Sequence, residues 1–109
     1  MTDAVDLVRH YLRAQNLEQL GRIDEAIELY ERALKAGFDS AGPYDRLIHL
    51  YAGRAAHGEV IRVAEAALVS VRTHEAKRAW YATMRDEARR ALASLPRPVP
   101  RRPDRSEQP

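Results

Sequence analysis

The chain lacks cysteine altogether, although it has 109 residues. Disulfides and thiolate metal sites are therefore excluded, and nothing points to an oxidising compartment. Aromatic residues make up only 6% of a chain that is 45% hydrophobic. Five glycines and the absence of alternating β-branched runs leave little support for a sheet. Much of the apolar fraction is alanine, which favours closely packed helices.

Long hydrophobic runs are also missing. No uncharged stretch approaches the ~20 residues that a membrane span needs. The segment from Met1 to Asp6 contains two aspartates and no apolar signal core. We therefore expect a cytoplasmic protein without a membrane partner.

The charge of the chain is unevenly distributed. Residues 1–72 carry 11 acidic and 9 basic side chains, whereas residues 73–94 carry three and five, and residues 95–109 carry two and four. The net charge of +2 therefore arises in the C-terminal third of the chain.

Apolar residues recur at helical spacing from Asp3 to about Leu95 and predict an all-α fold of about five helices. The first two are expected at residues 3–20 and 24–36, ended by Gly21 and Gly37, with Asp24 as a cap of the second. The third and fourth are expected on either side of a break at residues 56–58, and the fifth from a Thr73 cap to Leu95. Five of the last fourteen residues are proline, which predicts an extended, solvated tail over residues 96–109.

The chain also repeats itself. A shift of 34 residues places Ile27, Glu31, Ala33 and Leu34 on the identical residues Ile61, Glu65, Ala67 and Leu68 without a gap. A period of this length built from two antiparallel helices is typical of tetratricopeptide repeats.

The segment from Gly21 to Leu34 resembles the second half of the tetratricopeptide consensus. Gly21 stands at the turn glycine, Ala26 and Ala33 at the small contact positions, and Tyr30 at the aromatic position. The resemblance implies an α-solenoid, with one repeat at about 7–40, a second at about 41–74 and a capping helix at about 74–95. The second repeat matches less well, since Ile48 and Val60 are larger than the residues usual there.

The fifth helix is expected to cover the apolar face that the second repeat leaves open. Trp80 and Met84 are interpreted as packing onto that repeat. The alternative interpretation makes Trp80 an exposed anchor for a partner.

The resemblance further implies a groove lined by the first helix of each pair, in which the family holds an extended peptide or a partner's helix. The matching positions are Val8, Tyr11, Gln15, Glu18, Asp45, Arg46, His49 and Ala52. This mixture suits polar peptide recognition anchored by tyrosine. A clamp for C-terminal carboxylates is disfavoured, because Arg46 is the one plausible donor among the corresponding residues. The alternative is that these residues only form a solvated helix surface.

Catalysis has little support in the sequence. The four histidines show no close metal-binding spacing, and glycines are scattered, so we expect neither an enzyme nor a cofactor. The basic C-terminal end offers the alternative of nucleic-acid binding. Its candidate contacts are Arg85, Arg89, Arg97, Arg101 and Arg102. The proline- and arginine-rich tail could instead be a ligand for another domain or a solubilising segment. Self-association into a homo-oligomer through uncovered repeat faces is a third alternative.

Overall fold

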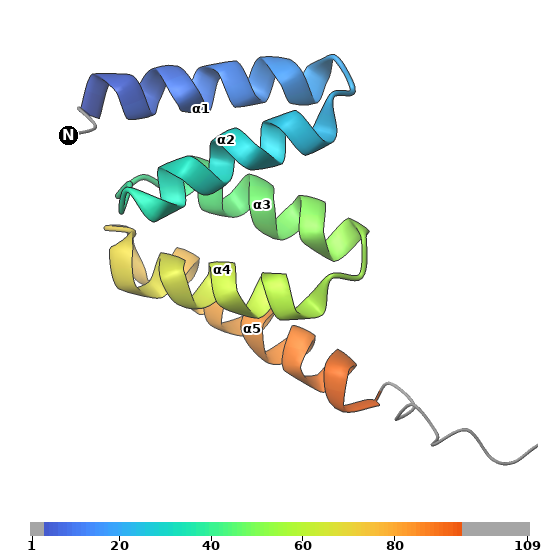
Figure 1. The fold of residues 1–109 in the computed structure, drawn as a ribbon. Coiled ribbons are helices and arrows are strands. Elements are labelled where there is room, and N and C mark those ends of the chain that lie inside the picture. The colour runs from blue at the N-terminus through green and yellow to red at the C-terminus, as the bar shows by residue number, and fades with distance from the viewer. Residues whose placement is uncertain (1–3, 95–109) are drawn as a thin grey trace, which may run out of the picture.

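A computed structural model describes residues 4–94 of the chain as a stack of five helices (Figure 1). The helices are α1 (Ala4–Gln19), α2 (Ile23–Lys35), α3 (Ala41–Gly53), α4 (His57–Ser70) and α5 (Glu75–Ser94). This range contains no strand, so the prediction of an all-α fold built from helix pairs is confirmed. The expected tail at residues 96–109 lies outside the described residues.

Helices that follow one another in the chain also lie against one another, from α1 at the top of Figure 1 to α5 at the bottom. Local chemistry supports the individual helices. In α2, for example, Asp24 and Glu25 stand in the first turn, and Arg32 and Lys35 in the last. These charges complement the partial charges at the two ends of the helix.

The turns repeat with the same 34-residue period as the sequence. Gly21 after α1 has φ 78°, and Ala55 after α3 has φ 55°. The Gly21 and Arg22 amides donate to Glu18 and Leu17, and the Ala55 and Ala56 amides donate to Ala52 and Tyr51 in the same pattern. Each is a helix end closed by a left-handed residue. The two turns therefore have one geometry, although the second has no glycine.

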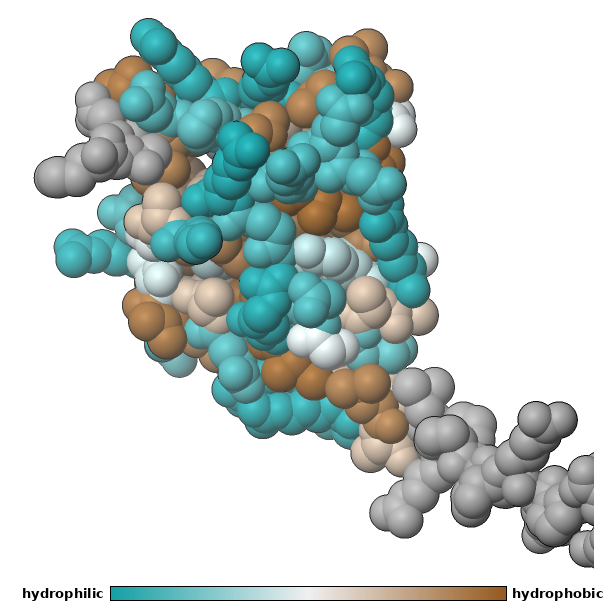
Figure 2. Space-filling view, in the orientation of Figure 1, coloured by the Kyte–Doolittle hydropathy of each residue, from teal (hydrophilic) through white to brown (hydrophobic). Residues whose placement is uncertain are grey.

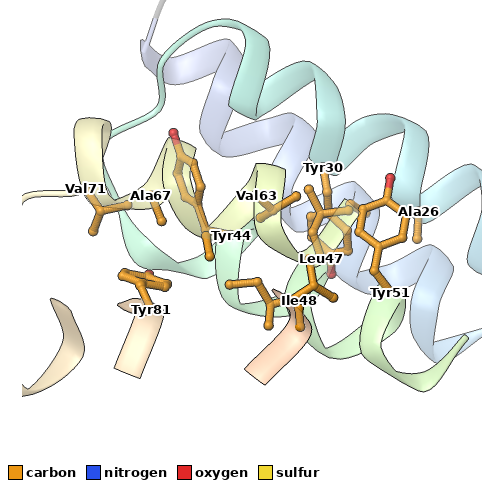
Figure 3. Packing of buried hydrophobic residues seen from close by; sticks show 14 of the residues in the cluster. Ala26, Tyr30, Tyr44, Leu47, Ile48, Tyr51, Val63, Ala67, Val71 and Tyr81 are labelled. Atoms are coloured by element: carbon orange, nitrogen blue, oxygen red, sulfur yellow. The ribbon is translucent and has the colours of Figure 1, made fainter. Parts of the chain in front are cut away.

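The core follows this period too. Ala26 and Val60 are buried at equivalent positions, as are Ala33 and Ala67. Between the helix pairs, tyrosines and aliphatic residues interdigitate in one continuous cluster (Figure 3). Tyr30, Tyr44 and Tyr81 are its largest fully buried side chains. The few aromatic rings of this chain thus mostly serve the core.

Three expectations about helix starts were wrong. Helix α2 begins at Ile23, and Arg22 rather than Asp24 takes the cap position without a side-chain hydrogen bond. The break between α3 and α4 comes before His57 rather than at residues 56–58. Thr73 does not cap α5. The residue before this helix is His74, whose Nδ1 atom accepts a hydrogen bond from the Lys77 amide at 3.3 Å.

The interpretation of Trp80 and Met84 as packing residues is confirmed, because both are partly buried against the core cluster. Tyr81, which was not among the expected packing residues, is fully buried. Trp80 and Met84 therefore lie at the edge of the interface between α5 and the core cluster. Tyr81 occupies its centre, because its ring reaches the core while its hydroxyl finds a carboxylate.

Candidate functional site

The residues expected to form a groove lie on α1 and α3, and α5 continues the same face. We call the surface formed by Val8, Tyr11, Gln15, Glu18, Asp45, Arg46, His49, Ala52 and Trp80 the odd-helix face. Several of its polar and aromatic side chains contact neighbouring helices through hydrogen bonds or ring contacts.

Tyr11 fills the space between α1 and α3 instead of projecting from the surface. A Cβ atom built on Gly42 would lie 2.5 Å from the Tyr11 ring, so the close approach depends on glycine at that position. The Tyr11 hydroxyl accepts a hydrogen bond from Gln15 Nε2 at 2.9 Å. Its ring centroid lies 6.0 Å from that of Tyr30. The Tyr11 hydroxyl is therefore engaged within the protein, with Gln15 as its hydrogen-bond donor.

Glu18 connects three helices. Its carboxylate accepts from Arg46 Nε at 3.1 Å and from a second nitrogen of the same guanidinium. It also accepts from the Tyr30 hydroxyl at 2.8 Å. The hydrogen bond from Arg46 lowers the pKa of Glu18, while burial and the adjacent carboxylate raise the pKa of Tyr30. The charges of Glu18 and Arg46 neutralise one another, so this part of the face carries no cluster of charges of one sign.

Asp45 plays the same part between α3 and α5. It accepts from the Tyr81 hydroxyl at 2.7 Å and from Lys77 Nζ at 2.6 Å. Burial is the main cause of the raised pKa of Tyr81. Lys77 Nζ also lies 4.9 Å from the centroid of the Trp80 ring, and the His49 ring lies 5.6 Å from that ring.

Lys77 and Tyr81 were not among the expected site residues. The repeat offered no signal for them, because the 34-residue period places Tyr11 and Ala79 at the positions equivalent to Asp45, whereas Asp45 binds residues 32 and 36 positions later.

Part of the odd-helix face remains open to solvent. His49 and Ala52 are exposed, and Val8 retains 44% of its surface. The neighbouring Leu12 of α1 is 56% exposed. The open part of this face thus consists of apolar and aromatic surfaces around an internally paired polar network.

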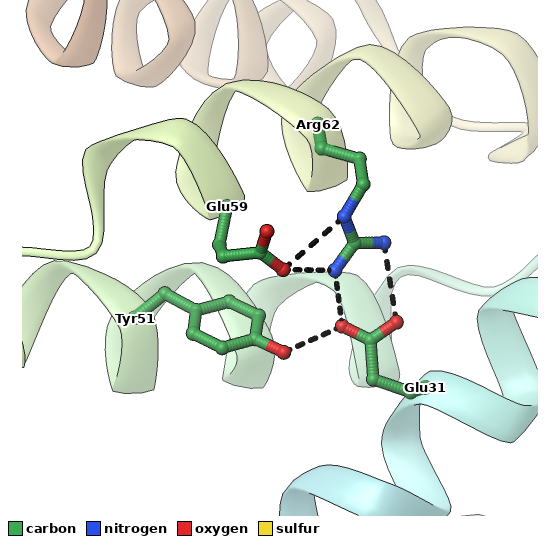
Figure 4. Close-up of polar contacts among 4 residues, drawn as sticks. All are labelled: Glu31, Tyr51, Glu59 and Arg62. Atoms are coloured by element: carbon green, nitrogen blue, oxygen red, sulfur yellow. Dashed lines mark hydrogen bonds and ion pairs between the residues drawn. The ribbon is translucent and has the colours of Figure 1, made fainter.

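A third arrangement of tyrosine, carboxylate and base lies toward α2 and α4 (Figure 4). Glu31 accepts from the Tyr51 hydroxyl at 2.6 Å and from both terminal nitrogens of Arg62, which also reaches Glu59. Figure 2 looks onto this side of the stack and shows mainly hydrophilic residues across its middle. The same arrangement of a tyrosine, a carboxylate and a base therefore links neighbouring helices on both sides of the protein.

The basic residues expected as nucleic-acid contacts are only partly described. Arg85 Nε lies 3.0 Å from Asp86, and Arg89 Nη2 lies 2.6 Å from Glu65. Both are thus engaged with acids. Arg97, Arg101 and Arg102 lie outside the described residues.

Within residues 4–94, no group of three or more histidines and carboxylates lies close enough to hold a metal ion. None of the helices in that range is long and apolar enough to cross a membrane. No family model, curated protein or solved structure compared with this chain matches it.

Proposed function

We propose that this chain is a non-catalytic scaffold of the tetratricopeptide kind, which binds a peptide or helix of a partner protein on the odd-helix face. The observation that carries the proposal is the combination of exposed and fixed side chains there. Val8, His49 and Ala52 are open to solvent, and the network beneath them holds their helices in place.

A fixed surface suits recognition because less conformational entropy is lost when the partner binds. The tilted ring pair of His49 and Trp80 gives such a surface an aromatic anchor. The absence of cysteine supports placing this activity in the cytoplasm. Nucleic-acid binding is the weaker candidate, because Arg85 and Arg89 already pair with acids.

The test compares two substitutions of the same type. Ala52→Arg adds a long charged side chain to the odd-helix face, whereas Val69→Arg adds one to α4, where Val69 is 88% exposed. Neither residue is buried, so both variants should keep wild-type helicity. Proteins captured from a lysate of the source organism by the wild type and by Val69→Arg should be lost with Ala52→Arg. Capture of the same proteins by all three would rule out this face as the binding surface.

A further inference from the structure

The end of the stack at α1 carries a groove that no described helix covers. Two hollows of about 360 Å³ and about 340 Å³ lie between α1 and α2. His10 and Arg32 line both hollows, so they form one continuous depression. We call it the α1–α2 groove; its other lining residues are Leu7, Arg13, Leu17, Glu25, Glu28, Leu29, Lys35 and Ala36.

One repeat further on, the equivalent place is occupied by a helix. Residues 34 positions after His10, Arg13 and Leu17 are Tyr44, Leu47 and Tyr51, and all three are buried. Helix α2 lies against α3 there, and its Glu31 bonds to Tyr51 of α3 and Arg62 of α4 (Figure 4). The geometry of the repeat thus makes the α1–α2 groove a seat for a helix.

The polar lining of the groove has an excess of base. Both acids are already paired, because Glu25 lies 2.6 Å from Arg22 and Glu28 lies 3.4 Å from Arg32. Arg13 and Lys35 make no ion pair with any residue that the structure describes. A ligand with carboxylates at matching positions would therefore meet unpaired cations.

The floor of the groove is apolar with one unsatisfied polar atom. Leu7 and Leu17 are buried, with 8% and 7% of their surface exposed. The Nδ1 atom of His10 is buried and has no hydrogen-bond partner among residues 4–94. The equivalent Tyr44 has its partner, since its hydroxyl donates to the Phe38 carbonyl at 2.5 Å.

We propose that the α1–α2 groove binds an acidic amphipathic helix of a partner protein, at a second site separate from the odd-helix face. Apolar residues of that helix pack on the more open Leu29 of α2 and on Ala36 at the end of α2. Its carboxylates pair with Arg13 and Lys35. The complex also covers the exposed part of His10. The two sites share none of the residues that define them, so one chain can hold two partners at once.

The probes are two labelled peptides with the sequence of residues 22–37, because α2 fills the equivalent groove. The acidic probe carries Arg32→Glu and Lys35→Glu, and the basic probe carries Glu28→Lys and Glu31→Lys. Fluorescence anisotropy at low salt measures their binding to the full chain. The acidic probe should bind, and moderate salt should weaken it because the pairing is electrostatic. The basic probe should bind at least about tenfold more weakly.

Two variants of the chain locate the binding. Arg13 and Arg90 are both exposed, on α1 and α5 respectively, so Arg13→Glu and Arg90→Glu change the net charge equally and leave the core intact. Arg13→Glu should lower the affinity for the acidic probe about fivefold to tenfold, since the attraction between Arg13 and the carboxylates of the probe becomes a repulsion. Arg90→Glu and Ala52→Arg should leave its affinity unchanged. Ala52→Arg thereby separates this site from the odd-helix face.

Equal affinity for the two probes, or equal losses with Arg13→Glu and Arg90→Glu, would overturn the proposal. Sedimentation of the full chain as a dimer that becomes a monomer with Arg13→Glu would assign the groove to a second copy and would overturn it as well.

Discussion

The turn between α3 and α4 provides the sharpest test of the repeat geometry. Ala55 holds φ 55° there, a backbone conformation that costs an L-residue roughly 1–2 kcal/mol. The preceding repeat places Gly21 at the equivalent position with φ 78°. We therefore expect Ala55→Gly to stabilise the protein, which is the opposite of what glycine usually does.

The magnitude follows from two opposing effects. Glycine removes the strain of the left-handed backbone, but it also gives the unfolded chain more conformational freedom. This freedom reduces the gain in folding stability by about 0.4–1 kcal/mol. A net stabilisation of about 0.5–1 kcal/mol remains. For a chain of this size it should raise the midpoint of thermal unfolding by roughly 2–8 °C. Circular dichroism at the helix band, recorded during heating and in urea, measures both quantities.

Two matched variants bracket the result. Ala52→Gly lies three residues earlier, inside α3, and should destabilise by about 1 kcal/mol because glycine is a poor helix former. Gly21→Ala should destabilise through the backbone alone, since no atom lies within 4 Å of the added Cβ. The reasoning fails if Ala55→Gly lowers stability as Ala52→Gly does.

Two further predictions concern the odd-helix face. Gly42→Ala should destabilise by about 1–3 kcal/mol in urea unfolding, because the new Cβ would collide with the Tyr11 ring at 2.5 Å. Gly58→Ala, with open space in α4, should instead stabilise by up to about 1 kcal/mol, and a loss in both variants would refute the Tyr11 contact. Glu18 has a lowered pKa in the folded protein, chiefly because it accepts a hydrogen bond from Arg46. The contribution of Glu18 to stability is therefore complete above its unfolded pKa of about 4.3. That contribution is lost as the pH falls through the lower folded pKa. Stability measured between pH 6 and pH 3 should therefore decline less in Glu18→Gln than in wild type, and parallel curves would contradict the Arg46 pairing.

Helix positions were largely predictable because they depend on neighbouring residues in the chain. The period of apolar residues and the glycines at 21 and 37 placed the helix ends within a few residues of those observed. The caps were less predictable. Thr73 and Asp24 are good capping residues in general, but the observed first residues of α5 and α2 leave them outside the cap position.

The candidate site was predictable as a set of positions but not as chemistry. The expected residues do share the α1 and α3 side of the stack, yet their role depends on partners supplied by other helices. Glu18 and Asp45 look like free carboxylates in the sequence. In the folded chain each accepts hydrogen bonds from a buried tyrosine and a base.

The sequence alone determined that the chain forms helices in pairs with a 34-residue period, because hydrophobic spacing and left-handed turns are local properties. Only the tertiary structure decided that Tyr81 rather than Trp80 enters the core. It alone showed that Ala55 takes the backbone conformation of a glycine, and that Arg13 and Lys35 flank an uncovered groove. These outcomes depend on how one helix is rotated against the next, which is set by packing between residues far apart in the chain.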